Sequence, residues 1–197
     1  MPGIDELIVR MRELQDELQV EFDKRRDGFQ FVVEQKRIRF AEDVVALQRG
    51  AKTGLFTYMF GASLRVWLTV PVIYAGAIPL LLLDLFIWIY QSLCFPVYRI
   101  PKVKRSEYLV LDRGDLEYLN AAQKLGCFYC GYANGLASYF REVAARTEQY
   151  WCPIKHSRRI LAAHDHYPNF FEFGDAESYR LGLERLRAQL AEQGLDT

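Results

Sequence analysis

Residues 56–98 read FTYMFGASLRVWLTVPVIYAGAIPLLLLDLFIWIYQSLCFPVY, a run in which Arg65 and Asp84 are the only charged side chains. One membrane-spanning helix needs about 20 apolar residues, so this run is too long for one crossing and suits two. Glycine and proline within residues 75–79 favour a reversal near its middle. The pattern predicts a transmembrane or re-entrant helical hairpin over residues 55–98.

Basic residues flank this run at both ends. They are Arg37, Arg39, Arg49 and Lys52 upstream, and Arg99, Lys102, Lys104 and Arg105 downstream. Because Lys and Arg mark the cytoplasmic side, the flanks predict a cytoplasmic (inner) membrane protein with both termini in the cytoplasm. The alternative is a buried hairpin in a soluble protein, but so short a chain has little else to cover that much apolar surface. The lipid bilayer is the expected partner.

The two charges inside the run also have two interpretations. We expect Arg65 to reach the near membrane interface and Asp84 to lie close to the turn at the far one. A functional pair between them inside the membrane is the alternative.

Composition narrows the classes of function. The 197 residues have no net charge, so a nucleic-acid partner is not expected. The acidic start does not resemble a secretory signal, and four cysteines are few for a disulfide scaffold. No phosphate-binding glycine loop, nucleophilic serine motif or His-Glu-x-x-His is present, so no small-molecule substrate is evident and the sequence does not decide whether the protein is an enzyme.

Three cysteines and a histidine have the spacing of a metal site. Cys127 and Cys130, with two residues between them, come after Gly126, which can end a helix, and Cys152 and His156 follow a helical spacer. If the spacer belongs to a helical hairpin, both pairs meet at one ion. Three thiolates and an imidazole suit tetrahedral zinc, with iron as the alternative. Four protein ligands close the coordination shell, so the site is expected to be structural.

Two resemblances accompany this pattern. CFYCGY and the later Cys-Pro resemble the metal-binding turns of rubredoxins and zinc ribbons, which implies a metal. The wider run CFYCGYANGL through REVAARTEQYWCPIKH resembles a family of bacterial membrane proteins and implies no activity. The long spacer and the histidine depart from rubredoxin, which favours zinc.

Other roles for these residues stay open. Cys127 and Cys130 could exchange disulfides, with Cys152 as a resolving thiol, or all three could be ordinary buried cysteines. His164 is an alternative fourth ligand, although a surface loop anchored by aromatic residues explains it as well. Charged residues of the spacer could orient His156, or could simply be solvated; they are Arg141, Glu142, Arg146 and Glu148.

Amphipathic helices are expected at both ends of the chain. Leu7, Met11, Leu14 and Leu18 form a seam like that of a coiled coil, and a helical stripe of Phe29, Val33, Phe40, Val44 and Leu47 continues it, with Gly28 as a possible break. Tyr179, Leu183, Leu186 and Leu190 repeat the spacing, with Asp175 as N-cap. These seams pack within the chain or between copies in a homo-oligomer.

The sequence therefore predicts a mostly α-helical protein in four segments. They are an amphipathic region (1–54), a membrane hairpin (55–98), a helical domain pinned by a metal (99–174) and a C-terminal amphipathic helix (175–197). The expected function is a membrane-anchored scaffold or adaptor with structural zinc. The alternatives are a membrane-tethered thiol redox or iron electron-transfer protein, and a membrane-shaping oligomer.

Overall fold

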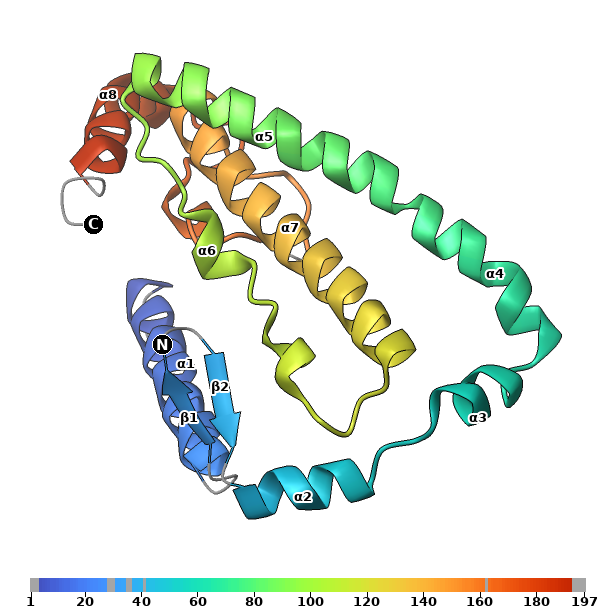
Figure 1. Ribbon diagram of the computed structural model, residues 1–197. Coiled ribbons are helices and arrows are strands. Elements are labelled where there is room, and N and C mark those ends of the chain that lie inside the picture. Colours follow the sequence, from blue (N-terminus) through green and yellow to red (C-terminus); the bar gives the residue numbers. More distant parts are fainter. Residues whose placement is uncertain (1–3, 28–30, 35–36, 41, 162, 193–197) are drawn as a thin grey trace. The chain divides into compact units, whose positions relative to one another are not determined.

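A computed structural model describes the chain except for residues 1–3, 28–30, 35–36, 41, 162 and 193–197. The protein is mostly helical, as predicted (Figure 1). Its residues group into two compact units. The first unit comprises Met1–Ala62 and Asp112–Phe128, and the second comprises Ser63–Leu111 and Tyr129–Thr197. The division into four consecutive segments stays a prediction.

The first unit contains a helix of 24 residues, a β-hairpin and several shorter helical elements. Its elements are α1 (Ile4–Asp27), β1 (Phe31–Glu34), β2 (Arg37–Phe40), α2 (Glu42–Gly50), α3 (Leu55–Phe60) and the 3-10 turn η1 (Asp112–Asp115). β1 and β2 pair antiparallel, with Phe31 opposite Phe40.

This hairpin corrects the helical stripe predicted through Val33 and Phe40. Both residues lie in strands, where alternation rather than a 3.6-residue period sets the faces. The local sequence FVVE and RIRF is rich in residues with high β propensity, which explains the outcome. Gly28 and Phe29 lie outside the described residues.

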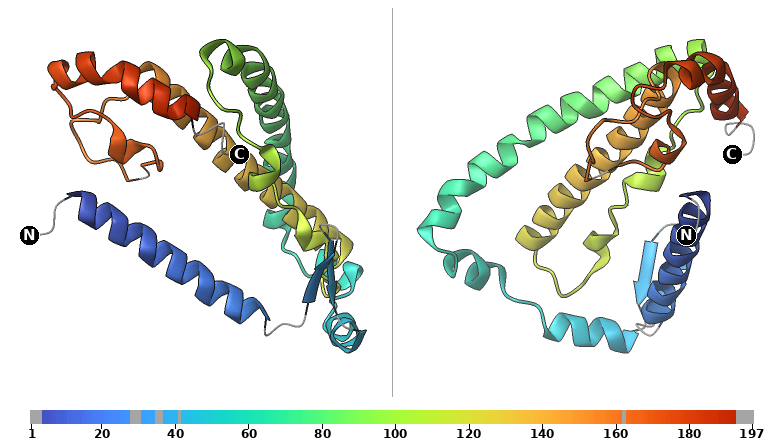
Figure 2. Two further views of the ribbon diagram at one scale, coloured as in Figure 1. Left: turned by 90° about the vertical axis from the view of Figure 1, so that its left-hand side faces the viewer. Right: turned by 180° about the vertical axis from the view of Figure 1, so that it is seen from behind.

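The second unit is built on one long apolar helical segment. α4 (Leu64–Ala75) and α5 (Ala77–Tyr98) follow one another through Gly76, which itself has helical angles (φ −59°, ψ −17°). The chain therefore keeps its direction where the sequence predicted a reversal (Figures 1 and 2). Pro79 lies in the first turn of α5, where a missing N–H costs no helical hydrogen bond, so it does not break the helix. The helical hairpin predicted over residues 55–98 is wrong.

α7 (Ala121–Trp151) is a second long helix, and its part from Tyr129 onward lies beside α5. The two helices run parallel, since Asp84 contacts Tyr132, Gln91 contacts Tyr139 and the ring of Tyr98 packs against that of Tyr150. The chain returns between them through an extended segment that includes the short helix α6 (Arg105–Tyr108).

Close approach to α7 requires a glycine. A Cβ at Gly135 would lie 2.7 Å from the carbonyl oxygen of Tyr108 in the return segment. Gly135 is buried in the middle of α7, where it lies against the returning backbone, and the helix continues through it. The sequence prediction that the helix ends at Gly126 is wrong.

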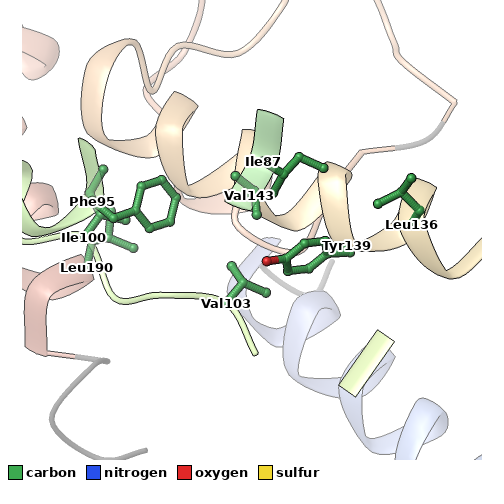
Figure 3. Close-up of a cluster of buried hydrophobic side chains, with 8 residues drawn as sticks. All are labelled: Ile87, Phe95, Ile100, Val103, Leu136, Tyr139, Val143 and Leu190. Carbon is green, nitrogen blue, oxygen red and sulfur yellow. The ribbon is translucent and has the colours of Figure 1, made fainter. Parts of the chain in front are cut away.

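The core of the second unit lies between α5, the return segment and α7, and it is closed by α8 (Ala176–Glu192). Its eight buried side chains are drawn in Figure 3: Ile87, Phe95, Ile100, Val103, Leu136, Tyr139, Val143 and Leu190.

α8 confirms the helix predicted at this end of the chain. Asp175 Oδ1 accepts a hydrogen bond from Ser178 N at 3.0 Å, which is the predicted N-cap. Leu186 and Leu190 are buried, so this seam packs within the chain.

Candidate membrane-contact site

Three polar side chains of α5, those of Asp84, Tyr90 and Gln91, point into the protein. Asp84 receives two hydrogen bonds from the Arg105 guanidinium, at 3.1 Å from Nε and 2.7 Å from Nη2, and a third from Tyr132 Oη at 2.9 Å. The hydrogen bond with Asp84 is the main reason that the pKa of Arg105 is raised. Asp84 therefore pairs with Arg105 and Tyr132, and not with Arg65 as the alternative interpretation had it.

Gln91 lies about two helical turns after Asp84, and both ends of its side-chain amide are hydrogen-bonded. Its amide oxygen accepts a hydrogen bond from Val103 N at 2.7 Å, and its amide nitrogen donates to Tyr139 Oη. Tyr90 Oη is 3.1 Å from Thr147 Oγ1. Every one of these partners belongs to the return segment or to α7, so α5 directs its polar groups toward its own protein.

The opposite side of the same helical segment is apolar and exposed. The large side chains on it are Val66, Leu68, Val72, Ile73, Ile78, Leu81, Leu82, Leu85, Phe86, Trp88, Ile89, Leu93 and Val97. We call this set the outer face. A surface helix in water shows the reverse arrangement, with polar residues outward. A contiguous apolar surface of this extent marks a contact with lipid or with another protein.

α4 and α5 together are long and apolar enough to cross a membrane, and 6% of their most apolar window is buried. No other helix in the described part of the chain meets that criterion. A helix of the soluble core is mostly buried, and this one is not.

One side chain of α7 holds the junction between α4 and α5. Tyr129 Oη donates a hydrogen bond to the carbonyl oxygen of Ile73 at 2.7 Å, and its ring packs on Tyr74. A Cβ at Gly76 would lie 2.6 Å from Tyr129 Oη, so a larger residue there would require that hydroxyl to shift. Gly76, which the sequence suggested as part of a turn, is a contact point for Tyr129.

Segments before and after the apolar helix meet in the first unit. Asn120 Nδ2 donates to the carbonyl oxygen of Thr53 at 3.3 Å, and Glu117 N donates to Gln48 Oε1 at 3.1 Å. Arg49 and Glu117 form an ion pair at 3.5 Å. The chain therefore comes back to the same place after the apolar helix.

The predicted metal ligands lie at two ends of one helix. Cys127 and Cys130 are one turn apart inside α7, and Cys152 follows directly after its last residue. At 1.5 Å per residue, about 30 Å of helix separates Cys130 from Cys152. The expected hairpin in the spacer is absent from this helix, so the four residues as arranged do not fit one ion. No group of three or more His, Cys, Asp or Glu among the described residues is placed to hold a metal.

The environments of these residues also bear on the redox alternative. Cys127 lies well inside α7, whereas a helix N-terminus is the place that stabilises a thiolate. Burial, with the nearby Glu148 carboxylate, raises the pKa of Cys152, which makes it a poorer nucleophile at neutral pH. His156 stacks on Tyr167, whose hydroxyl accepts a hydrogen bond from His156 N at 2.7 Å.

The other two histidines fasten the loop after α7 back onto that helix. His164 Nε2 is 2.9 Å from Glu148 Oε2, and His166 Nε2 is 3.1 Å from Glu142 Oε1. The hydrogen bond with His166, followed by that with Arg146, lowers the pKa of Glu142 to about 2. The sequence analysis considered His164, Glu142 and Glu148 as metal ligand or orienting residues, whereas in the structure they hold the loop after α7 against that helix.

No protein-family model, curated protein or solved structure was found to match this chain. Asp84, Gln91 and Tyr129 were missed as a site because their partners are distant in sequence. The signal that could have found them is the presence of polar residues seven apart, Asp84 and Gln91, inside an otherwise apolar helix.

Proposed function

We propose that the protein is a membrane-bound scaffold whose α4–α5 segment is embedded in one leaflet of the bilayer without crossing it. The observation that supports this most directly is the orientation of α5. Its polar groups are satisfied by protein partners, while its outer face is apolar. Hydrocarbon is the environment that this distribution suits, because unpaired polar groups are costly there and apolar ones are not.

The contacts within the first unit argue against a single crossing. Thr53 and Asn120 touch, so they lie on the same side of any membrane. The chain between them must then cross an even number of times. One described helix is apolar enough to cross, and the return segment after it contains several charged residues. A segment that does not cross the bilayer at all satisfies this condition without any change in the fold described above.

Charged residues at both ends of the segment agree with an interfacial position. Arg65 lies at its start, and Arg99 and Lys104 follow its end. Basic residues beside an apolar helix face attract anionic headgroups and hold such a helix at the membrane surface.

The scaffold part of the proposal rests on α1. Leu7, Met11, Leu14 and Leu18 are each about half exposed, at 52%, 50%, 57% and 55%. Their spacing is typical of helix pairing, so a second copy of the chain is the proposed partner of this seam. Zinc stays a prediction that the arrangement of the cysteines does not favour.

Vesicle flotation tests the membrane contact. Leu82→Glu places a charge on the outer face, where Leu82 is 63% exposed, and should weaken vesicle binding about ten-fold or more because burying one leucine is worth about 1.5–3 kcal/mol. Gln189→Glu, on the exposed side of α8, adds the same charge and should have no effect.

Two results would contradict the proposal. One is a wild-type protein that does not float with vesicles. The other is an L82E variant that floats as well as Q189E does. If size measurements then showed a soluble oligomer dissociated by L82E, the outer face would be a protein interface.

A further inference from the structure

A groove opens beside α5 at the point where its apolar face meets the return segment. Its volume is about 550 Å³. Leu81, Leu85 and Trp88 of α5 form one wall, and Lys102 and Arg105 of the return segment form the other. Gln91 and Tyr139 close its floor, where they are hydrogen-bonded to each other. The groove thus has an apolar side continuous with the outer face and a basic side.

The basic side of the groove carries one positive charge that no carboxylate in the described part of the chain neutralises. The Arg105 guanidinium is neutralised by Asp84, although half of the Arg105 side chain remains exposed. Lys102 is exposed and forms no hydrogen bond or ion pair among the described residues. The two cations and one carboxylate therefore leave the groove with a net positive charge, contributed by an ammonium that is available to a ligand.

We propose that this groove binds the headgroup of an anionic phospholipid. The phosphate group is placed at Lys102 and the exposed edge of Arg105, and the first part of an acyl chain lies along Leu81 and Leu85. Trp88, on the same wall as Leu81 and Leu85, supplies an indole ring of the kind that membrane proteins place at the bilayer interface. This assignment rests on the proposed function, because it needs the outer face to lie in the bilayer.

The test compares vesicles of phosphatidylcholine with vesicles that also contain phosphatidylglycerol. Wild-type protein should bind both, and the anionic vesicles more tightly. Lys102→Gln should remove about five-fold of the preference for anionic vesicles, since one basic residue at such a surface is worth about 1 kcal/mol. Binding of K102Q to phosphatidylcholine alone should match wild type.

A matched control variant distinguishes a specific headgroup site from nonspecific electrostatic attraction to anionic vesicles. Arg158→Gln removes one exposed positive charge from the loop after α7, and should leave the preference unchanged. Inorganic phosphate added in solution should not compete, because the acyl chain supplies part of the binding.

The outcomes distinguish this inference from the proposed function. Equal binding of wild type to both kinds of vesicle, or an equal loss in K102Q and R158Q, would overturn the headgroup site while leaving the membrane contact intact. Competition by inorganic phosphate would overturn the lipid assignment. Absence of binding to either vesicle would overturn both proposals.

Discussion

Replacing Glu142 with glutamine tests how the loop after α7 is held in place. Glu142 accepts hydrogen bonds from His166 and from Arg146, whose Nε lies 2.7 Å from Glu142 Oε1. Its pKa falls from 4.5 to about 2 on folding. That difference corresponds to about 3 kcal/mol at 1.36 kcal/mol per unit. The Glu142 side chain is 15% exposed, so solvent screens this interaction little.

The sign of the effect follows from the direction of the shift. Because folding lowers the pKa of Glu142, its carboxylate stabilises the fold above about pH 4.5, and this contribution is lost as the pH falls toward 2. E142Q should therefore reduce the free energy of unfolding by up to about 3 kcal/mol at neutral pH. The difference from wild type should shrink as the pH approaches 2.

Urea unfolding followed by circular dichroism, at a series of pH values in one detergent, measures both free energies. Glu184→Gln is the matched control, because Glu184 is 83% exposed and its ion pair with Arg187 should contribute little. A difference between wild type and E142Q that does not change with pH would refute the linkage. So would a variant as stable as wild type at neutral pH.

Further predictions concern the backbone and the cysteines. Gly135→Ala should destabilise the fold by about 1–3 kcal/mol, because the added Cβ would meet the Tyr108 carbonyl oxygen. Gly114→Ala is the control, since Gly114 has open space around it, and this variant should be as stable as wild type. Equal unfolding midpoints for the two variants would contradict the packing described. Arg99 has a left-handed φ of 56° at the end of α5, so Arg99→Gly should stabilise the protein by up to about 1 kcal/mol in the same unfolding assay, and a loss of stability would refute this. Cys130→Ser should leave the zinc content per chain unchanged, and loss of a stoichiometric ion would show that the separated cysteines come together.

Local patterns predicted the helices well. The apolar helix within residues 55–98, the amphipathic helix α8 and its cap at Asp175 were each predicted from residues close together in the chain. The structure confirms all three. Predictions that depended on a reversal of the chain failed. Gly76 suggested a turn, but in the structure Tyr129 approaches its backbone closely and the helical segment continues through it.

The candidate site could be predicted only in part. The sequence indicated a membrane contact, but the face of α5 that meets it is set by Asp84 and Gln91, whose partners are Arg105, Tyr132 and Val103. These are contacts between elements, and no spacing along the chain specifies them. The metal prediction needs Cys130 and Cys152 to converge, whereas the structure has a continuous α7 between them, so zinc binding stays a prediction.

The measurement that tests the membrane account most directly is the depth of three outward positions in the bilayer. Spin labels at Leu68, Ile78 and Leu93, in a background without native cysteines, report depth through their accessibility to oxygen and to a polar nickel complex. An α4–α5 segment embedded in one leaflet predicts similar depths at all three. A crossing helix would place Ile78 up to about 15 Å deeper than Leu68, given ten residues of helical rise. That result would contradict the account.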